Sequence, residues 1–239
     1  MIPYWMSRTQ LMLGDAPMEQ LMTKNVLVVG LGGVGAICAE MIVRAGVGKI
    51  TIVDNDRVDA SNINRQIQAL HSTVDKSKAK VLSERLLDIN PNLQLTVHEM
   101  YIKEEITTNL LASAPWDYVV DCIDTLSSKV FLITQCLEMK LPIVSSMGAG
   151  GKTDPTQIDI ADFSKVHHCK LARYLKKKLY RSGIRSGITA VFSPEEVSEQ
   201  ALQLTENTLN KRSYYGTVSY IPALFGGHCA SVVLRDLMG

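Results

Sequence analysis

Four closely spaced glycines form the first group of residues that could do chemistry. Gly30, Gly32, Gly33 and Gly35 follow the apolar run at 26–29 and open an Ala-rich stretch typical of a helix. Glycines let the turn between strand and helix bend tightly and let its backbone approach a ligand closely. The positive end of the following helix then points at an anion. We therefore predict that this turn binds a phosphate group.

An acidic residue after the next predicted strand indicates that the phosphate belongs to a nucleotide. Asp54 lies near the end of the run KITIVDND at 49–56, 24 residues after Gly30. A carboxylate at this spacing accepts hydrogen bonds from ribose hydroxyls. The glycines alone leave NAD, FAD and ATP open, whereas a Walker-type P-loop is excluded because no Gly-Lys-Ser/Thr follows them.

The stretch after this strand favours ATP. DNDRVDASNINRQIQAL at 54–70 contains Asn62, Arg65 and Gln66. A dehydrogenase has no need for these side chains just beyond its ribose-binding carboxylate. An enzyme that cleaves a triphosphate needs cations and amide donors around the phosphates.

The elements that must position these residues alternate between strands and helices. We expect strands at 26–30, 49–54, 94–98, 116–124 and from 142, and helices at 34–45, up to about 89, at 127–139 and at 223–238. This order is typical of an α/β, Rossmann-like, doubly wound and mostly parallel sheet. Alternating residues at 156–161 and 217–221 predict antiparallel strands added in the C-terminal half.

Composition limits the class of protein. The 239 residues are 46% hydrophobic and carry a formal net charge of +1, which suits one α/β domain over 1–239. Five scattered cysteines with no CxxC pair favour reduced thiols over disulfides or a structural zinc site. With no run of about 18 apolar residues and no signal-peptide pattern, we expect a cytoplasmic protein without a membrane partner.

Several longer segments resemble the adenylating superfamily that contains ThiF, MoeB and the ubiquitin-activating enzymes. Within it the chain is most similar to the TcdA (CsdL) family of tRNA threonylcarbamoyladenosine dehydratases. The resemblance rests on RTQLMLGD at 8–15, GLGGVGA at 30–36, DNDRVDASNINRQIQALHSTV at 54–74, DINPN at 88–92 and GAGGKTDPTQI at 148–158. The sequence departs from the superfamily pattern at Asp75, where Gly is frequent, and at Ala36, where Ser is common.

The resemblance assigns roles to individual residues. It implies ATP and Mg²⁺ as cofactors, phosphate contacts from Asn62, Arg65 and Lys78, and a magnesium ligand at Asp124. It also implies that Arg8 is an arginine finger that reaches the nucleotide of a partner subunit, so that the active form is a homodimer. Taken together, the expected catalytic and nucleotide-binding residues are Arg8, Gly30, Gly32, Gly33, Gly35, Asp54, Asp56, Asn62, Arg65, Gln66, Lys78 and Asp124.

A basic segment follows in the C-terminal half. Residues 165–185 contain eight Lys or Arg and no Asp or Glu. Leu171, Leu175 and Leu179 recur at helical spacing, so a helix can bury one apolar stripe and project cations elsewhere. Such a helix suits the backbone of a polyanion. If the family resemblance holds, the polyanion is tRNA, contacted by Arg173, Lys176, Lys177, Lys178 and Arg181.

Cys169 lies beside this segment, where protein-activating relatives carry a thioester-forming cysteine. His167, His168 and Lys170 could lower its pKa. Cyclisation of an adenylated carboxylate needs no enzyme thioester, however, and we expect Cys169 to be a bystander.

The resemblance implies a division of labour and an activity. We expect a nucleotide-binding half at about 20–150 and a tRNA-contacting half at about 151–239. The expected reaction is the ATP-dependent dehydration, by cyclisation, of threonylcarbamoyladenosine beside the anticodon, through adenylation of its carboxylate. Alternatives are ThiF- or MoeB-like adenylation of a sulfur-carrier or ubiquitin-like C-terminus, and a nucleotide-sensing module without catalysis. A sulfur-transfer protein is a further expected partner.

Overall fold

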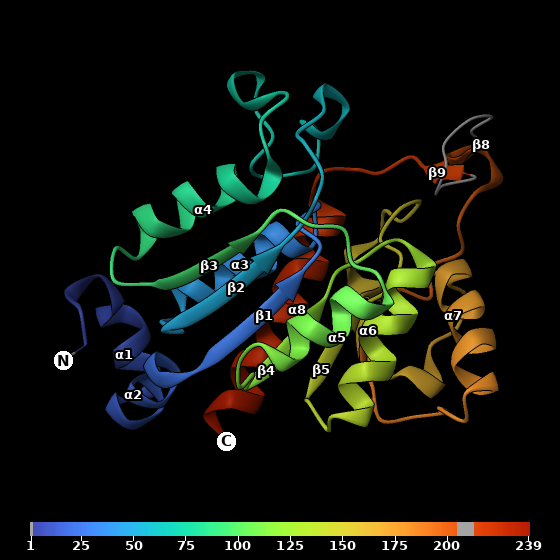
Figure 1. The fold of residues 1–239 in the computed structure, drawn as a ribbon. Helices are drawn as coiled ribbons and strands as arrows, with labels where there is room; N and C mark the ends of the chain where they lie inside the picture. Colours follow the sequence, from blue (N-terminus) through green and yellow to red (C-terminus); the bar gives the residue numbers. More distant parts are fainter. Residues whose placement is uncertain (1, 205–212) are drawn as a thin grey trace.

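The computed structural model describes residues 2–204 and 213–239. Its central feature is a seven-stranded sheet in the order β3-β2-β1-β4-β5-β7-β6 (Figure 1). The strands are β1 (Asn25–Val29), β2 (Lys49–Val53), β3 (Gln94–His98), β4 (Tyr118–Asp121), β5 (Ile143–Ser146), β6 (Asp159–Asp162) and β7 (Thr189–Phe192). All neighbours are parallel except β6 and β7. The doubly wound, mostly parallel sheet predicted from the sequence is thus confirmed.

Helices cover both faces of the sheet. The α-helices are α1 (Ser7–Leu13), α2 (Asp15–Thr23), α3 (Gly35–Arg44), α4 (Lys78–Ile89), α5 (Glu104–Ala112), α6 (Leu126–Glu138), α7 (Lys170–Arg181) and α8 (Tyr220–Met238). Residues of α3, α4 and α8 pack in one hydrophobic cluster, and residues of α5, α6 and α7 pack in the other. Short 3₁₀ helices lie at Tyr4–Met6, Ala60–Asn62, His71–Thr73, Pro155–Gln157, Phe163–Lys165 and Glu199–Ala201.

Alternation along the strands explains the two cores. In β1, Val26 and Val28 belong to the cluster with α3 and α8, whereas Leu27 and Val29 belong to the cluster with α6. Successive side chains of a strand point to opposite faces, so a strand buried on both sides reads as a continuous apolar run. Each such buried side chain contributes about 1.5–3 kcal/mol.

The C-terminal half differs from the prediction in two places. The antiparallel pair in the main sheet is β6 with β7, and β7 was not predicted. The predicted strand at 217–221 is wrong, because α8 begins at Tyr220 and β8 (Leu202–Leu204) pairs with β9 (Ser213–Tyr215) in a separate two-stranded sheet. Pro222 is tolerated in the first turn of a helix, and Ile221 and Phe225 pack in the core one helical turn apart.

Three further helices were not predicted from the sequence. They are α1, α2 and α5. Among the helices of the described residues, none is long and apolar enough to cross a membrane.

Candidate functional site

The predicted nucleotide site lies where the sheet changes winding direction. From β1 the chain continues to β2 on one side, while β4 pairs on the other side of β1. Ligands of doubly wound sheets bind at the carboxyl ends of the strands at this point. The glycine turn follows β1, and the loop containing Asp124 follows β4. The topology therefore brings these two predicted parts of the site to the same edge of the sheet.

Close backbone contacts explain two of the glycines in this turn. Gly30 has φ +89°, and a Cβ added there would lie 2.8 Å from the carbonyl oxygen of Cys122. A Cβ added at Gly35 would lie 1.8 Å from the carbonyl oxygen of Gly30. Only glycine fits these positions, so the turn can pack directly against the end of β4.

The turn is more open at Gly32, and two buried side-chain amide oxygens lie beside it. An added Cβ at Gly32 meets only the Nε2 of Gln66, at 3.9 Å. The Oε1 atoms of Gln66 and Gln68 are buried and accept no hydrogen bond from the described part of the chain. Buried polar atoms normally have a partner. These two buried acceptors thus have no partner among the described residues, beside the turn that we predict to bind the nucleotide.

Asp54 supports the turn directly. Its carboxylate accepts hydrogen bonds from the backbone N–H of Leu31 at 2.6 Å and of Asp56 at 2.7 Å. Burial raises the pKa of the Asp54 carboxyl and outweighs these two bonds, which lower it. Each carboxylate oxygen can accept more than one bond, so the predicted contact with ribose hydroxyls stays compatible with this structural role.

The loop after β2 presents Asn62 and Arg65 next to the turn. The Asn62 side chain is buried, and its Oδ1 accepts the N–H of Asp59 at 3.2 Å in a capping box. The guanidinium of Arg65 donates to the Ser61 carbonyl and the Asn64 side chain, both at 2.8 Å. A Cβ added at Gly33 would lie 2.7 Å from the Arg65 carbonyl oxygen, so this loop packs on the glycine turn.

Lys78 begins α4 and brings a second cation to this loop. Its Nζ lies 3.0 Å from the Asp56 carboxylate, and its own N–H donates to the Asp56 carbonyl. Upstream, Asp75 has φ +66°, a left-handed conformation that glycine adopts freely and Asp tolerates. This conformation is one in which a glycine would also fit at position 75.

The two aspartates at the end of β4 have different environments. Asp121 is fully buried, pairs with Lys129 at 2.7 Å and accepts the Ser145 hydroxyl at 2.6 Å. Asp124 is exposed and follows the strand by three residues, because β4 ends at Asp121 and not at 124 as predicted. Asp121 is committed to the core, which leaves Asp124 as the carboxylate of this loop that faces solvent.

Arg8 and the glycine turn lie at opposite ends of β1 within one chain. Arg8 is an exposed residue of α1, and α1 and α2 lie beside the amino end of β1 (Figure 1). The glycine turn follows the carboxyl end of the same strand. The structure therefore does not bring Arg8 to the other predicted site residues within one chain.

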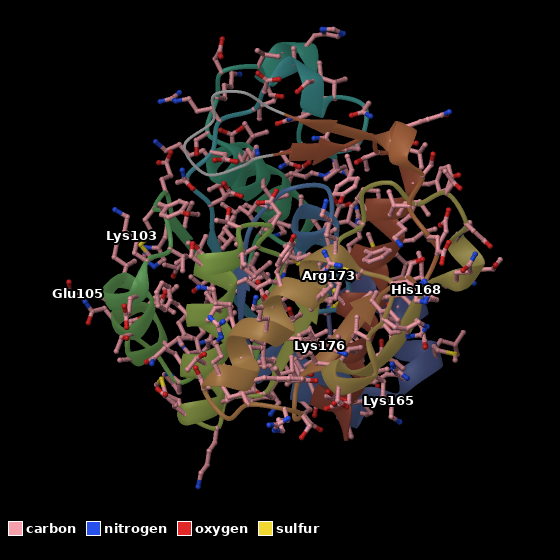
Figure 2. All side chains as sticks on the ribbon, turned by 90° about the vertical axis from the view of Figure 1, so that its right-hand side faces the viewer. Lys103, Glu105, Lys165, His168, Arg173 and Lys176 are labelled. Carbon is pink, nitrogen blue, oxygen red and sulfur yellow. The ribbon has the colours of Figure 1, made fainter. Side chains whose placement is uncertain are left out.

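The cations of α7 form an exposed surface, with one exception. Arg173, Lys177, Lys178 and Arg181 are exposed. Of the predicted stripe, Leu175 and Leu179 are buried and Leu171 is half-buried. Figure 2 shows Arg173 and Lys176 on α7, with His168 and Lys165 nearby.

Lys176 is that exception. Its Nζ donates to the carbonyls of Ser164 and Val166, at 2.8 and 2.6 Å. Burial lowers the pKa of the Lys176 ammonium. Lys176 therefore fixes the segment before α7 as well as adding positive charge.

Sequence reasoning missed a group of residues around GAGGKTDPTQI. Lys152 is buried and its Nζ donates to the Glu195 carbonyl, while the Glu195 carboxylate accepts the N–H groups of Thr153 and Asp154. Cys169 is the residue directly before α7, makes no side-chain capping hydrogen bond and is 9% exposed. The signal available in the sequence was the lysine directly after the glycines at 150–151.

Comparisons with known proteins agree with this geometry. Residues 7–239 match the ThiF family. The chain is 37% identical to the tRNA threonylcarbamoyladenosine dehydratase of Bacillus subtilis, over 97% of this chain and 95% of that protein. It is 32% identical to the Escherichia coli enzyme of the same name, over 96% and 92%. The crystal structure of E. coli TcdA in complex with ATP superposes with a TM-score of 0.87 at 33% identity, covering 97% of this chain and 93% of that one.

Proposed function

This chain belongs to the ThiF family, and we propose that it is an ATP-dependent tRNA threonylcarbamoyladenosine dehydratase. One observation carries the proposal. The glycine turn, Arg65 and Lys78 lie together at the switch point of a chain that aligns over nearly its whole length with dehydratases of that name. The similar E. coli structure is a complex with ATP, which supports ATP binding by this chain.

The reaction has two steps. The carboxylate of threonylcarbamoyladenosine attacks the α-phosphorus of ATP, an acyl–phosphate bond forms, and pyrophosphate leaves. A nucleophile of the same substrate then attacks the activated carbonyl, a ring closes and AMP leaves. Water is lost overall, and its atoms end in the cleaved ATP.

This chain's residues lower the barrier of the first step by preorganised charge. Two anions must approach each other, so fixed cations beside the phosphates stabilise the transition state. We assign this task to Arg65 and Lys78, with amide contacts from Asn62 and Gln66. Asp54 and Asp56 would orient the ribose and the lysine.

The carboxylate of Asp124 fits a role as a magnesium ligand. Mg²⁺ prefers oxygen ligands and is commonly held by one or two carboxylates together with substrate phosphates. When bound, the ion would neutralise charge on the leaving pyrophosphate.

A homodimer would bring Arg8 into use. The residues around it are exposed and apolar: Tyr4 is 92% exposed, and Leu11 and Met12 are each 83% exposed. A contiguous apolar surface is typical of a protein interface. We propose that α1 packs on a second copy, which would let Arg8 approach the nucleotide of that copy.

The remaining partners follow from the two halves of the chain. We propose that about 20–150 binds the nucleotide and that 151–239 contacts tRNA through the exposed cations of α7, in the cytoplasm where tRNA is modified. A sulfur-transfer protein is a further proposed partner. Cys169 needs no role in this proposed reaction, because the route contains no thioester between the enzyme and its substrate.

The test is a comparison of three substrates. Formation of AMP from ATP would be measured with tRNA carrying threonylcarbamoyladenosine, with the same tRNA lacking the modification, and with a carrier protein ending in Gly-Gly. We expect AMP and a cyclised nucleoside with the modified tRNA alone. Turnover with the carrier protein alone would instead support the ThiF- or MoeB-like alternative.

A further inference from the structure

A pocket lies beside the start of α7, and none of the four glycines of the turn lines it. It has a volume of about 590 Å³, within the range of sites that hold small ligands. We call it the α7 pocket. It is lined by Val166, His167, His168, Cys169, Lys170, Arg173, Lys176, Val197, Ser198 and Tyr215.

Two walls of the α7 pocket rest on the glycines of GAGGKTDPTQI. A Cβ added at Gly150 would lie 2.8 Å from the Cβ of Tyr215. A Cβ added at Gly151, which has φ +75°, would lie 2.4 Å from the Cγ1 of Val197. Side chains at either glycine would displace these walls. The two glycines of this segment therefore shape the pocket.

A short segment joins the α7 pocket to the nucleotide site. Tyr215 lines the pocket, and two residues later the Thr217 carbonyl accepts the Asn64 side chain at 2.9 Å. Asn64 in turn accepts a hydrogen bond from Arg65. Pro222 lies 2.9 Å from a Cβ added at Gly33. The segment at 215–222 thus contacts the pocket at Tyr215 and the predicted phosphate site at Thr217 and Pro222.

The lining of the pocket combines cations with apolar and aromatic surface. Lys170 and Arg173 are exposed cations at its edge, and no carboxylate belongs to the lining among the described residues. Glu196, outside the lining, pairs with His168 at 3.2 Å. Val166, Val197 and Tyr215 supply apolar surface. A nucleotide has the matching chemistry, because its phosphate suits the cations and its base stacks on aromatic side chains.

We propose that the α7 pocket holds the modified nucleotide of the RNA substrate while its carboxylate reaches the phosphate site. This inference rests on the proposed function. The pocket is continuous with the exposed cations of α7, since Arg173 belongs to both. That continuity favours a nucleotide within an RNA strand over a free mononucleotide, which needs no cationic surface beyond the pocket.

The test uses binding of an anticodon stem-loop RNA with and without threonylcarbamoyladenosine. Ser198→Trp fills the pocket, and Arg173→Ala removes a cation from its edge. Lys178→Ala is the matched control, because it removes an exposed cation of the same helix that does not line the pocket. Binding of ATP and thermal unfolding would check that each variant is folded.

We expect the wild-type protein to bind the modified RNA more tightly than the unmodified RNA. Ser198→Trp and Arg173→Ala should each raise the Kd of the modified RNA about tenfold and reduce this preference. Lys178→Ala should raise the Kd of the modified and the unmodified RNA by the same factor. The Kd of ATP should stay unchanged in all three variants.

Three outcomes would overturn the proposal. If both pocket variants keep the full preference while wild-type turnover is normal, the pocket does not hold the modified nucleotide and the proposed function stands. If the wild type neither binds nor converts the modified RNA, the proposed function fails as well. If AMP, added with saturating ATP, binds in the pocket and only this binding is lost in Ser198→Trp, the pocket is a free mononucleotide site.

Discussion

Lys78 and Asp56 form an ion pair of unequal burial: the ammonium and carboxylate are 3.0 Å apart, yet the side chain of Lys78 is 7% exposed and that of Asp56 is 57% exposed. A buried cation needs a partner. Because the partner here faces solvent, a phosphate oxygen can join the same ammonium without opening the core. The pair thus fixes the position of the Lys78 ammonium at the start of α4.

Lys78→Gln should impair adenylation more than folding. Loss of one preorganised cation costs about 10²–10³ in turnover, and the change should appear as slower release of pyrophosphate at saturating ATP. Lys80→Gln is the control, because Lys80 is an exposed residue of the same helix that pairs with Glu99 at 2.9 Å. Equal activity in the two variants would show that Lys78 does not contact the phosphates.

Asp124→Asn should abolish turnover at limiting Mg²⁺ and leave the melting temperature unchanged. The side chain is exposed, and an amide is a weaker magnesium ligand than a carboxylate. The assay is AMP formation across a magnesium titration. Wild-type rates in the variant at the lowest magnesium concentration would remove Asp124 from the proposed metal site.

Asp121→Asn should act on stability, in contrast to the change at Asp124. Asp121 and Lys129 are both fully buried and 2.7 Å apart, and removing one partner of such a pair costs about 3–5 kcal/mol because the other charge is left unpaired. Urea unfolding would measure the loss. Adding Lys129→Met to Asp121→Asn should restore part of the free energy of unfolding. A double variant that is less stable than Asp121→Asn would contradict this account.

The sequence predicted the unit of β1, α3 and β2 well because its signals are local, although it did not predict α1, α2 and α5. The glycines between 30 and 35, the apolar runs of β1 and β2, and Asp54 lie within one strand–helix–strand unit. Each close approach in this unit involves residues that the pattern itself specifies, such as Gly30 and Gly35. The nucleotide site follows from the same unit, together with the loop at 54–70.

The two errors in the C-terminal half depend on contacts distant in sequence. β7 is four residues long and is identified by its pairing with β5 and β6. The alternation at 217–221 resembles a strand, but Ile221 is needed in the core beneath α3 as part of α8. The pairing of Asp121 with Lys129 could not be read from either residue, because only the fold excludes solvent from both.

Glu195 should give the stability a specific pH dependence. Burial raises the pKa of its carboxyl, but the N–H groups of Asp154 and Thr153 and the Thr153 hydroxyl lower it further, so the pKa lies below its usual range. A depressed pKa contributes stability above the usual value of about 4.3 and loses it as the pH falls through the folded value.

The comparison of wild type with Glu195→Gln would test this effect. The difference in melting temperature should be constant between about pH 6 and 8 and should shrink as the pH falls below about 4. The same pH series with Glu99→Gln is an independent comparison, since the carboxylate of Glu99 pairs with exposed Lys80 and lies outside the loop of Glu195. A difference for Glu195→Gln that persists unchanged to pH 3 would contradict the proposed hydrogen-bonded carboxylate.

The three neighbouring lysines of α7 should separate into two classes. Lys177 and Lys178 are exposed, so changing both to Glu should raise the KM for tRNA and make the logarithm of the affinity fall less steeply with the logarithm of salt, by up to about 2 in slope. Lys176→Met should chiefly lower the melting temperature, because the ammonium of Lys176 bonds two carbonyls. The KM for ATP should be unchanged in both variants, since α7 contributes none of the residues at the glycine turn. If the double variant keeps the KM for tRNA and the wild-type salt slope, the exposed cations of α7 are a solvated surface and the RNA must bind elsewhere.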